Sequence, residues 1–338
     1  MVEQIVPTVL YTDVRERGRM VKVPSIQVKG RTLIVTGKWL KQASVYEEDI
    51  LEGEPVDDPH HFIQQLRESK LKADIFAFSQ KMTEHKPKHS YHFDWDNAAA
   101  IPITTYDDWF KNRTAMDVRQ NVRRAAKKGV VARSVPFDDQ LVEGIVQVFN
   151  EDPIRQGRAF WHYGKDFQTV KKETSHCVER SEFIGAYLGD ELIGFIKLLY
   201  ADKIAGIVIN VSKHKYFEKR APNALIAKAV EICAQKGMSY LTYAKYAYGK
   251  KGKSSLADFK RHNGFEQIEF PRYYVPLTLN GRIAVNLRLY RGLQEILPER
   301  VQLMVIQART KLYKKVLLPL KLARKAKEKQ TVSKVSAT

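Results

Sequence analysis

A β-hairpin signal followed by a long apolar strand constrains the fold of this chain more than any other feature. The runs Glu182–Leu188 and Glu191–Tyr200 are largely apolar and flank Gly189-Asp190, a residue pair that favours a tight turn between antiparallel strands. Ile204–Val211 is apolar almost throughout, which is typical of a strand covered on both faces. These three strands predict the centre of a sheet.

The elements that follow extend this sheet. Residues 222–236 show the spacing of an amphipathic helix, and Gly237 marks its end. Further strands are expected over 239–243 and 265–276, where β-branched and aromatic residues are frequent. A hairpin, a central strand, a helix and two more strands predict an α/β (α+β) fold, with a mixed central sheet flanked by helices.

The segment before the hairpin adds elements of both kinds. Residues 105–129 are helical in pattern and end at Gly129, a residue that commonly terminates helices. A strand over 130–135 and an amphipathic helix over 137–149 are predicted next.

The first hundred residues predict a smaller set of elements. Short β-rich runs on either side of Lys29-Gly30 indicate a hairpin over 20–36. Asp58 is the expected N-cap of a helix, with Pro59 at the first helical position. Residues 73–78 are suited to a buried strand.

Positive charge is the strongest signal in the composition. The formal net charge is +19, and the segment from Arg309 to the C-terminus, with ten Lys/Arg and one acid, carries +9 of it. The remaining 308 residues keep +10, so the body of the protein is basic without its tail. Such a surface favours polyanionic partners, namely tRNA, a diphosphate-linked substrate or an anionic membrane face.

Other bulk features narrow the class of protein. No run reaches the roughly 20 apolar residues of a membrane-spanning helix, and the N-terminal residues lack the pattern of a signal peptide. Only Cys177 and Cys233 are present, which predicts a reducing, cytoplasmic location rather than a disulfide framework. No metal site is expected, because the nearest histidine group, His85, His89 and His92, lies in a polar loop without cysteine.

Three segments carry a resemblance to a known family. They are Arg119–Val130, a basic helical stretch; Pro222–Ile226, at the start of the helix after the central strand; and Ser255–Phe265, with the sequence SLADFKRHNGF. In their order and spacing they resemble the Fem-type aminoacyltransferases of the N-acetyltransferase (GNAT) superfamily. These enzymes add amino acids to peptidoglycan precursors and take the acyl group from aminoacyl-tRNA. An uncharacterised group of bacterial acyltransferase-like proteins shares the pattern.

The resemblance implies tandem GNAT-like domains. Residues 1–104 would form a reduced N-terminal domain and residues 105–280 the transferase domain. A helical segment would follow over 281–312, and a basic, partly disordered tail over 313–338.

The donor-binding loop departs from that of coenzyme A-dependent relatives. Those enzymes hold the pyrophosphate on backbone N–H groups of a glycine-containing loop at a helix N-terminus. The matching stretch here, Lys219–Leu225, contains no glycine, and Pro222 lacks an N–H. The resemblance therefore favours aminoacyl-tRNA as the donor, and we expect no bound cofactor.

The segment from Asn150 to Lys165 is the most unusual in the chain and is expected to be an irregular loop. It combines acid–base groups, cations and aromatic rings, a mixture that suits a binding loop on a rigid scaffold. His162 and Glu151 are candidate proton acceptors, and the expected substrate-binding residues of the loop are Arg155, Arg158, Trp161, Tyr163 and Lys165. A packed structural loop is the alternative.

Further candidates flank the central strand. Lys260 could stabilise the developing oxyanion or hold a phosphate, or it could be an ordinary helix lysine. Many GNAT enzymes place a catalytic Glu near the central strand; here Asn210 stands in that region and could position substrate. Tyr243 or Tyr246 could protonate the leaving group, although both could serve packing.

Two basic clusters are candidate anion- or tRNA-binding sites. They consist of Arg119, Arg123, Arg124, Lys127 and Lys128 on the predicted helix, and of Lys219 and Arg220 before the next one. Like charges four residues apart destabilise a helix, so an anionic partner is expected, unless acids brought in by the fold compensate. The C-terminal tail could rest on an anionic membrane surface or bind RNA.

Three functions remain open at this level. The first is transfer of an aminoacyl group from aminoacyl-tRNA to an amine of a cell-envelope precursor or a small peptide. The second is N-acylation of a sugar amine or small metabolite from acyl-CoA or an acyl-carrier protein. The third is an inactive relative that binds RNA or an anionic surface, and fold alone does not separate them.

Overall fold

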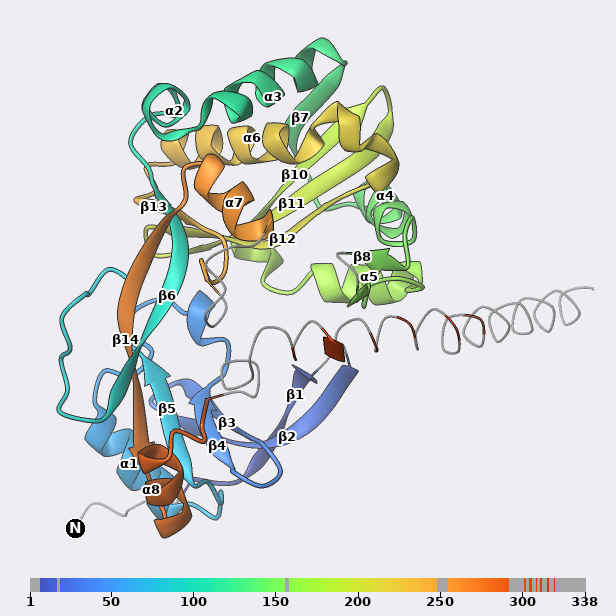
Figure 1. Ribbon diagram of the computed structural model, residues 1–338. Helices are drawn as coiled ribbons and strands as arrows, with labels where there is room; N and C mark the ends of the chain where they lie inside the picture. Colours follow the sequence, from blue (N-terminus) through green and yellow to red (C-terminus); the bar gives the residue numbers. More distant parts are fainter. Residues whose placement is uncertain are drawn as a thin grey trace, which may run out of the picture.

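The chain forms two lobes joined by a pair of long strands (Figure 1). The computed structural model describes residues 7–16, 19–155, 158–247 and 255–291, with isolated positions between 301 and 319. Strands β6 (Phe93–Pro102) and β14 (Glu266–Pro276) run along one side and connect the lobes. Most of the basic tail predicted over 313–338, and most of residues 292–312 of the predicted helical segment, lie outside the described residues.

The N-terminal lobe contains a strand meander and one crossover helix. Its elements are β1 (Leu10–Glu16), β2 (Arg19–Val28), β3 (Arg31–Thr36), β4 (Gln42–Val45), η1 (Glu48–Ile50), α1 (Pro59–Glu68) and β5 (Ile75–Ser79). The predicted hairpin is confirmed: Lys29 and Gly30 have φ angles of 46° and 73°, as a tight turn between β2 and β3 requires. The predicted cap is confirmed too, because the Asp58 carboxylate accepts from the His61 N–H.

The C-terminal lobe holds the longer succession of elements. It begins with α2 (Tyr106–Asp108), a π-helix η2 (Trp109–Arg113), α3 (Met116–Lys127), β7 (Val130–Val135), α4 (Asp139–Phe149), β8 (Ile154–Arg155), β9 (Arg158–Ala159), α5 (Phe167–Thr174) and η3 (Val178–Arg180). It continues with β10 (Ser181–Leu188), β11 (Glu191–Ala201), β12 (Ile204–Ser212), η4 (His214–Lys219), α6 (Ala221–Gln235), β13 (Tyr240–Thr242) and α7 (Ser255–His262). After β14 the chain returns to the N-terminal lobe and ends its described part with α8 (Leu279–Asn286).

One continuous sheet of 12 strands runs through both lobes, in the order β1-β2-β3-β4-β5-β14-β6-β13-β12-β11-β10-β7. Strand β14 joins the halves, because it pairs with β6 over Glu266–Tyr273 and with β5 over Arg272–Pro276. The sequence predicted a separate sheet for each domain. The two sheets are continuous because a strand of 11 residues is long enough to pair with strands of both lobes.

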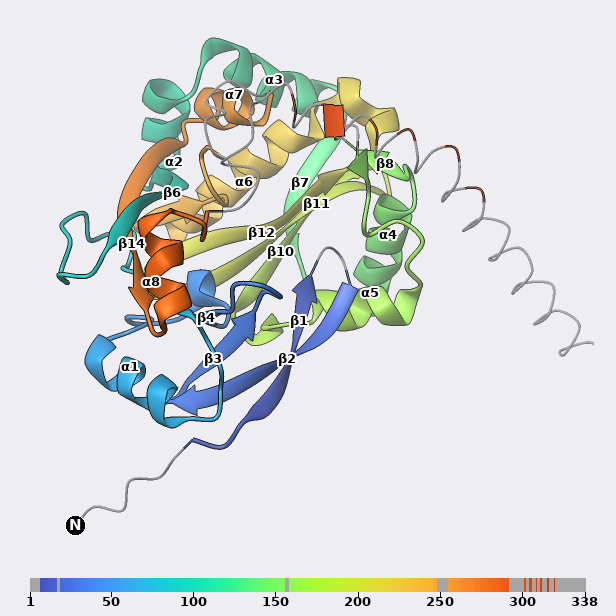
Figure 2. The same cartoon turned by 60° about the horizontal axis from the view of Figure 1, so that its bottom comes forward.

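Helices cover both faces of the sheet in the C-terminal lobe (Figures 1 and 2). Helix α6 lies beside α3 on one face, where it buries Leu225, Ile226, Ala229 and Val230. Helix α4 covers the opposite face with a separate apolar cluster that includes Phe149. The mixed sheet flanked by helices that the sequence predicted is thus confirmed.

Polar contacts join the lobes a second time, on the side away from β6 and β14. The β1–β2 hairpin reaches toward α5 (Figures 1 and 2), and the Arg15 guanidinium lies 2.8 Å from the Glu173 carboxylate. Nearby, Arg180 donates to the Ile50 carbonyl at 2.9 Å, and the Gly53 N–H donates to Asp202 at 3.0 Å.

Within the described ranges, every helix is too short or too polar to span a lipid bilayer.

Candidate active site

A fork between β12 and β13 opens the sheet at the centre of the C-terminal lobe. The two parallel strands pair only over Ile204–Gly206 and Tyr240–Thr242, whereas β12 continues to Ser212. A bulge accompanies the separation: Ile207 and Ile209 have consecutive partners on β11, and Val208 between them is unpaired and 45% exposed. The β12 edge beyond Gly206 therefore offers backbone groups to a substrate that lies along it.

Two polar side chains of β12 lie on the α6 side of this fork. Asn210 stands opposite Ile196, which belongs to the core beneath α6, and its amide has no hydrogen-bond partner among the described residues. The Ser212 hydroxyl is buried and likewise lacks a partner in that part of the chain. A Cβ on Gly194, its cross-strand neighbour, would lie only 2.3 Å from this hydroxyl, so glycine is required there. The structure thus leaves polar groups available beside the fork.

The N-terminus of α6 lies where the chain returns from β12. Arg220 precedes the helix in the left-handed region, with φ 59°. Pro222 has no N–H, and the N–H groups of Asn223 and Ala224 donate to the Arg220 carbonyl at 3.1 and 3.4 Å. Few backbone donors remain for a diphosphate at this helix end, in agreement with the sequence prediction for the loop.

The segments that carried the family resemblance contact one another. The buried Asn223 and Asn263 side chains form a hydrogen bond of 3.4 Å. The Asn263 side-chain amide also donates to the Phe259 carbonyl, and the main-chain carbonyl of Asn263 accepts from the Trp109 indole at 2.9 Å. These bonds fix α7 against α6 and η2. Both asparagines lie within segments that carry the family resemblance, and neither was among the predicted site residues.

Lys260, on α7, is buried beside the segment that follows β13 and does not lie on the surface. Its side chain is 1% exposed, and its ammonium donates to the main-chain carbonyls of Tyr243 and Lys245 at 2.6 and 2.7 Å. Burial lowers the pKa of Lys260 to about 8. The ammonium is also 4.7 Å from the centre of the Tyr243 ring. Lys260 therefore holds the segment that follows β13 in position.

The predicted loop of residues 150–165 packs against the end of β12. Arg155 donates to the Ser212 carbonyl at 2.6 Å and to the Val148 carbonyl at 3.1 Å. Glu151 accepts from Arg155 and from the N–H groups of His214 and Lys215. These contacts join the loop, β12 and η4, and they already occupy two groups predicted to bind substrate or accept a proton.

His162 is enclosed by aromatic and cationic side chains. Its ring stacks on Phe149 with a centroid distance of 4.0 Å, and only 6% of the residue is exposed. Burial, then the charges of Lys165, Arg15 and Arg155, lower the pKa of His162 to about 2. An imidazole with so little affinity for a proton is a weak general base at neutral pH, which disfavours the predicted role.

Among the other candidates of this loop, some contact neighbouring side chains and some lie on the surface. Trp161 is 43% exposed, with Lys165 and Arg15 over its ring at 4.1 and 4.5 Å. Lys165 also forms an ion pair with Glu173 at 2.6 Å. Arg158 is exposed on the short strand β9, and the Tyr163 N–H donates to the Phe160 carbonyl. Of the loop candidates, Arg155 makes a direct contact with the fork.

The basic helix predicted from the sequence is α3, and it carries several exposed basic side chains. Arg123, Arg124 and Lys127 are exposed, and none forms an ion pair within the described part of the chain. Arg119 donates to the Thr114 carbonyl. Lys128 donates to the Glu218 carbonyl at 2.9 Å, which places the end of α3 beside Lys219 and Arg220. The structure thus brings the two predicted basic clusters together.

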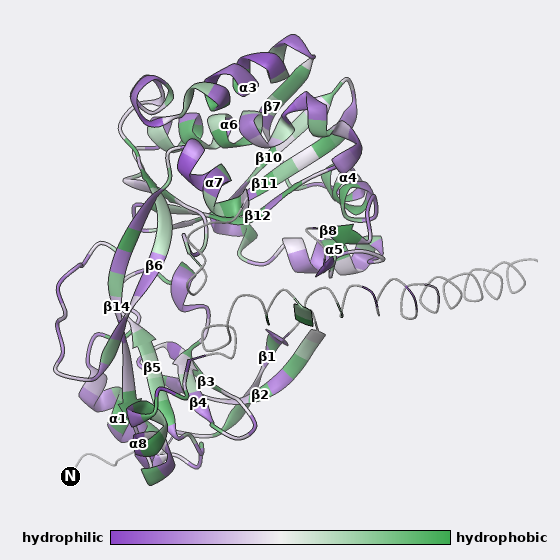
Figure 3. Cartoon of the chain, in the orientation of Figure 1, coloured by the Kyte–Doolittle hydropathy of each residue, from purple (hydrophilic) through white to green (hydrophobic). Residues whose placement is uncertain are grey.

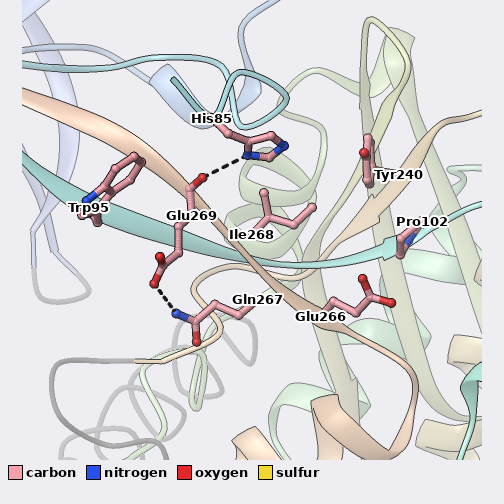
Figure 4. Close-up of a pocket in the computed structure, with 8 residues that line it drawn as sticks. All are labelled: His85, Trp95, Pro102, Tyr240, Glu266, Gln267, Ile268 and Glu269. Atoms are coloured by element: carbon pink, nitrogen blue, oxygen red, sulfur yellow. Dashed lines mark hydrogen bonds between the residues drawn. The ribbon is translucent and has the colours of Figure 1, made fainter. Parts of the chain in front are cut away.

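Two hollows flank β14, and one of them is lined by a candidate residue, Tyr246. One, of about 630 Å³, is shown in Figure 4 and includes the carboxylates of Glu266 and Glu269, with His85 against the Glu269 carbonyl at 3.2 Å. The other, of about 670 Å³, includes Tyr246 and Arg261. The first is lined mainly by residues of β6, β13 and β14, and the second by residues of η2, α7 and the start of β14.

One group of side chains could hold a metal ion. Glu47, His176 and Cys177 place their ligand atoms within 4.8 Å of one another, where the two lobes meet. The His176 ring nitrogen is 2.9 Å from the Glu47 carboxylate and 3.4 Å from the Cys177 sulfur. These hydrogen bonds account for the arrangement without an ion, and we assign it no metal.

The chain shares its overall fold with solved structures of other proteins. The chain is similar to the crystal structure of FemX, with a TM-score of 0.52 over 82% of this chain and 90% of that one, at 11% identity. It also matches L-PGS from Bacillus licheniformis (TM-score 0.49, 13% identity, 77% of this chain and 86% of that one). A tandem GNAT protein from the clavulanic acid pathway matches with a TM-score of 0.41 at 8% identity, over 76% and 83%. No protein-family model and no curated protein sequence matches the chain.

Proposed function

We propose that this protein is an aminoacyltransferase that takes its acyl group from aminoacyl-tRNA. The acceptor would be an amine of a cell-envelope precursor or of a small peptide. The observation that carries the proposal is the exposed basic face of α3, formed by Arg123, Arg124 and Lys127, which form no ion pair within the described residues and lie near the N-terminus of α6.

This position suits a tRNA donor. Exposed arginine and lysine side chains without ion pairs bind a phosphate backbone and release its counterions. Lys128, which donates to the Glu218 carbonyl, connects that face to Lys219 and Arg220 at the entrance of α6. A tRNA bound there would bring its acylated end toward the fork between β12 and β13.

The α6 N-terminus supports the same donor over coenzyme A. A diphosphate is normally held by several free N–H groups at a helix start. Here Pro222 has none, and the N–H groups of Asn223 and Ala224 already donate to Arg220.

In this proposal the acceptor nitrogen attacks the ester carbonyl carbon of the aminoacyl-tRNA. A C–N bond forms, the C–O bond to the ribose breaks, the nitrogen loses a proton and the ribose oxygen gains one. Asn210 and the β12 edge would orient the acyl group, and Tyr243 would protonate the leaving oxygen. Lys260 would act as a positioning residue, since its ammonium binds the carbonyl of Tyr243.

Within this proposal the acceptor amine enters the fork already deprotonated. His162 has a pKa lowered to about 2, and Glu151 accepts three hydrogen bonds from the protein, so neither is suited to remove the proton. The rate should therefore rise with pH until the acceptor amine itself is largely deprotonated.

An N-acyltransferase that uses an acyl-carrier protein is a second candidate. The open β12 edge would pair with an amide-containing carrier arm as readily as with an aminoacyl ester, and an acidic carrier protein would also bind the face of α3. Identification of the donor, either aminoacyl-tRNA or a charged carrier protein, therefore distinguishes the two functions.

A transfer assay tests the proposal. The full chain is incubated with bulk tRNA charged with labelled amino acids and with a mixture of amine acceptors, and label in the acceptor is measured. Wild type should transfer label, and the Tyr243→Phe variant should transfer less while folding normally. Transfer from acyl-CoA or a charged carrier protein, with none from aminoacyl-tRNA, would refute the proposed donor.

A further inference from the structure

An exposed apolar patch lies at the end of the N-terminal lobe, far along the chain from the candidate active site. Helix α8 and its C-cap residue form most of it: Leu279, Ile283 and Leu287 are 71%, 48% and 65% exposed. Their spacing of four residues places them on one face of the helix. The opposite face, with Ala284 and Val285, packs on Ile75. Figure 3 shows strongly apolar colour on α8 at this end of the molecule.

Trp39 lies in a segment that packs beside α8. It is 98% exposed, so its indole contributes almost nothing to the core. The Asp74 carboxylate ties the two segments together, because it accepts from the Lys41 N–H at 2.9 Å and from the Thr278 hydroxyl at 2.8 Å. Leu40, between Trp39 and Lys41, packs on the α8 cluster.

Exposed cations are present in the same two segments. Lys38, Lys41, Arg282 and Arg288 are exposed, and none forms an ion pair within the described part of the chain. The segments 37–41 and 278–291 contain no aspartate or glutamate. A partner of matching chemistry therefore presents negative charge at its surface and an apolar layer beneath.

We propose that this patch docks on an anionic phospholipid bilayer. Tryptophan favours the boundary between headgroups and acyl chains, where its apolar ring and its N–H are both satisfied. Leu279, Ile283 and Leu287 enter that boundary beside it, while the four cations bind anionic headgroups. The helix lies in the plane of the surface and does not cross it.

This inference differs from the sequence prediction, which placed membrane contact in the tail over 313–338. The binding itself does not depend on the proposed transfer reaction. If both hold, the protein works at a membrane surface, where lipid-linked amine acceptors are found.

The test measures co-sedimentation of the full chain with vesicles of phosphatidylglycerol and phosphatidylcholine, and with vesicles of phosphatidylcholine alone. Wild type should bind the anionic vesicles. The Trp39→Ser/Ile283→Ser/Leu287→Ser variant should lose most of this binding. The Lys38→Gln/Lys41→Gln/Arg282→Gln variant should weaken it by about fivefold for each cation removed.

Matched variants keep the test specific. Trp95→Ser removes another exposed tryptophan, on β6, and should leave vesicle binding unchanged. Arg123→Gln/Arg124→Gln/Lys127→Gln removes the same charge from the other lobe; it should retain vesicle binding, whereas the patch variants should retain tRNA binding. Failure of this proposal is therefore distinguishable from failure of the proposed donor.

Three results would overturn the proposal. One is unchanged vesicle binding in both patch variants, together with its loss when Lys321, Arg324, Lys325 and Lys327 of the tail are changed to Gln. The second is no binding of wild type to anionic vesicles. The third is shielding of Trp39 from iodide before vesicles are added, measured as the difference in fluorescence quenching between wild type and Trp39→Phe. Such shielding would show that another segment covers the patch.

Discussion

The Lys260 ammonium on α7 donates a hydrogen bond of 2.6 Å to the main-chain carbonyl of Tyr243, 17 residues earlier in the chain. A second bond, of 2.7 Å, reaches the Lys245 carbonyl. A lysine that sequence analysis treats as a catalytic or surface group is thus an internal support for one arm of the fork.

Replacement of Lys260 by Met should destabilise the protein by about 2–4 kcal/mol, because two main-chain carbonyls lose the charged donor that the buried ammonium provides. Urea unfolding of the variant and wild type measures the difference. The control is Arg261→Met, at the neighbouring exposed position of α7, which should change stability by less than about 0.5 kcal/mol. Equal stabilities of wild type and Lys260→Met would contradict the supporting role.

The Asn223–Asn263 contact should make the two positions energetically dependent. Asn263→Ala leaves the Phe259 carbonyl without its side-chain donor and Asn223 without its partner, and should cost about 2–3 kcal/mol. A double-mutant cycle with Asn223→Ala should give a coupling energy above about 0.5 kcal/mol. Additive effects would show that the two motif segments are held together by other contacts.

Stability should fall in mild acid partly because of His162. Its folded-state pKa is lowered to about 2, so below the unfolded value of 6.5 the unfolded chain takes up a proton that the folded protein does not. This contribution is present above pH 6.5 and is lost as the pH falls, by up to about 1.4 kcal/mol per pH unit. The difference in unfolding free energy between wild type and His162→Phe should therefore change between about pH 7.5 and about pH 5.

The matching experiment uses denaturant unfolding at both pH values. His162→Phe keeps an aromatic ring against Phe149 and removes the titration. A pH-independent difference between the two proteins would mean that His162 binds a proton equally well in the folded and unfolded states.

The elements that were predicted correctly are marked by turn or helix-capping residues close to them in the sequence. Gly189-Asp190, Lys29-Gly30 and Asp58-Pro59 fix turns and helix starts within a few residues, and the structure confirms all three. Strands β1 and β4 were not predicted. Strand β1 is largely exposed and strand β4 has four residues, so neither shows a clear apolar pattern.

Pairing and burial that depend on residues far apart in the sequence could not be predicted. Nothing in the residues of β14 indicates that its two ends pair with strands of different lobes. The burial of Lys260 and His162 likewise depends on elements distant in the chain, so it could not be predicted from their residue types. The basic face of α3 could be predicted because charge spacing on one helix is a local property.

The α3 face should control tRNA affinity. Arg123→Gln/Arg124→Gln/Lys127→Gln should weaken binding of bulk tRNA and reduce the slope of log affinity against log salt by about 2–3, near 0.7–0.9 for each lost phosphate contact. Lys38→Gln/Lys41→Gln/Arg282→Gln removes the same charge from the other lobe and serves as the control. An equal loss in both variants would indicate that only net charge matters.

The central claim, that aminoacyl-tRNA is the donor, is tested most directly by measuring binding of bulk aminoacyl-tRNA and of coenzyme A side by side, at low and at moderate salt. We expect tRNA to bind with a steep salt dependence and coenzyme A not to bind. Saturable binding of coenzyme A without binding of tRNA would contradict the account and identify the protein as an acyl-CoA-dependent transferase.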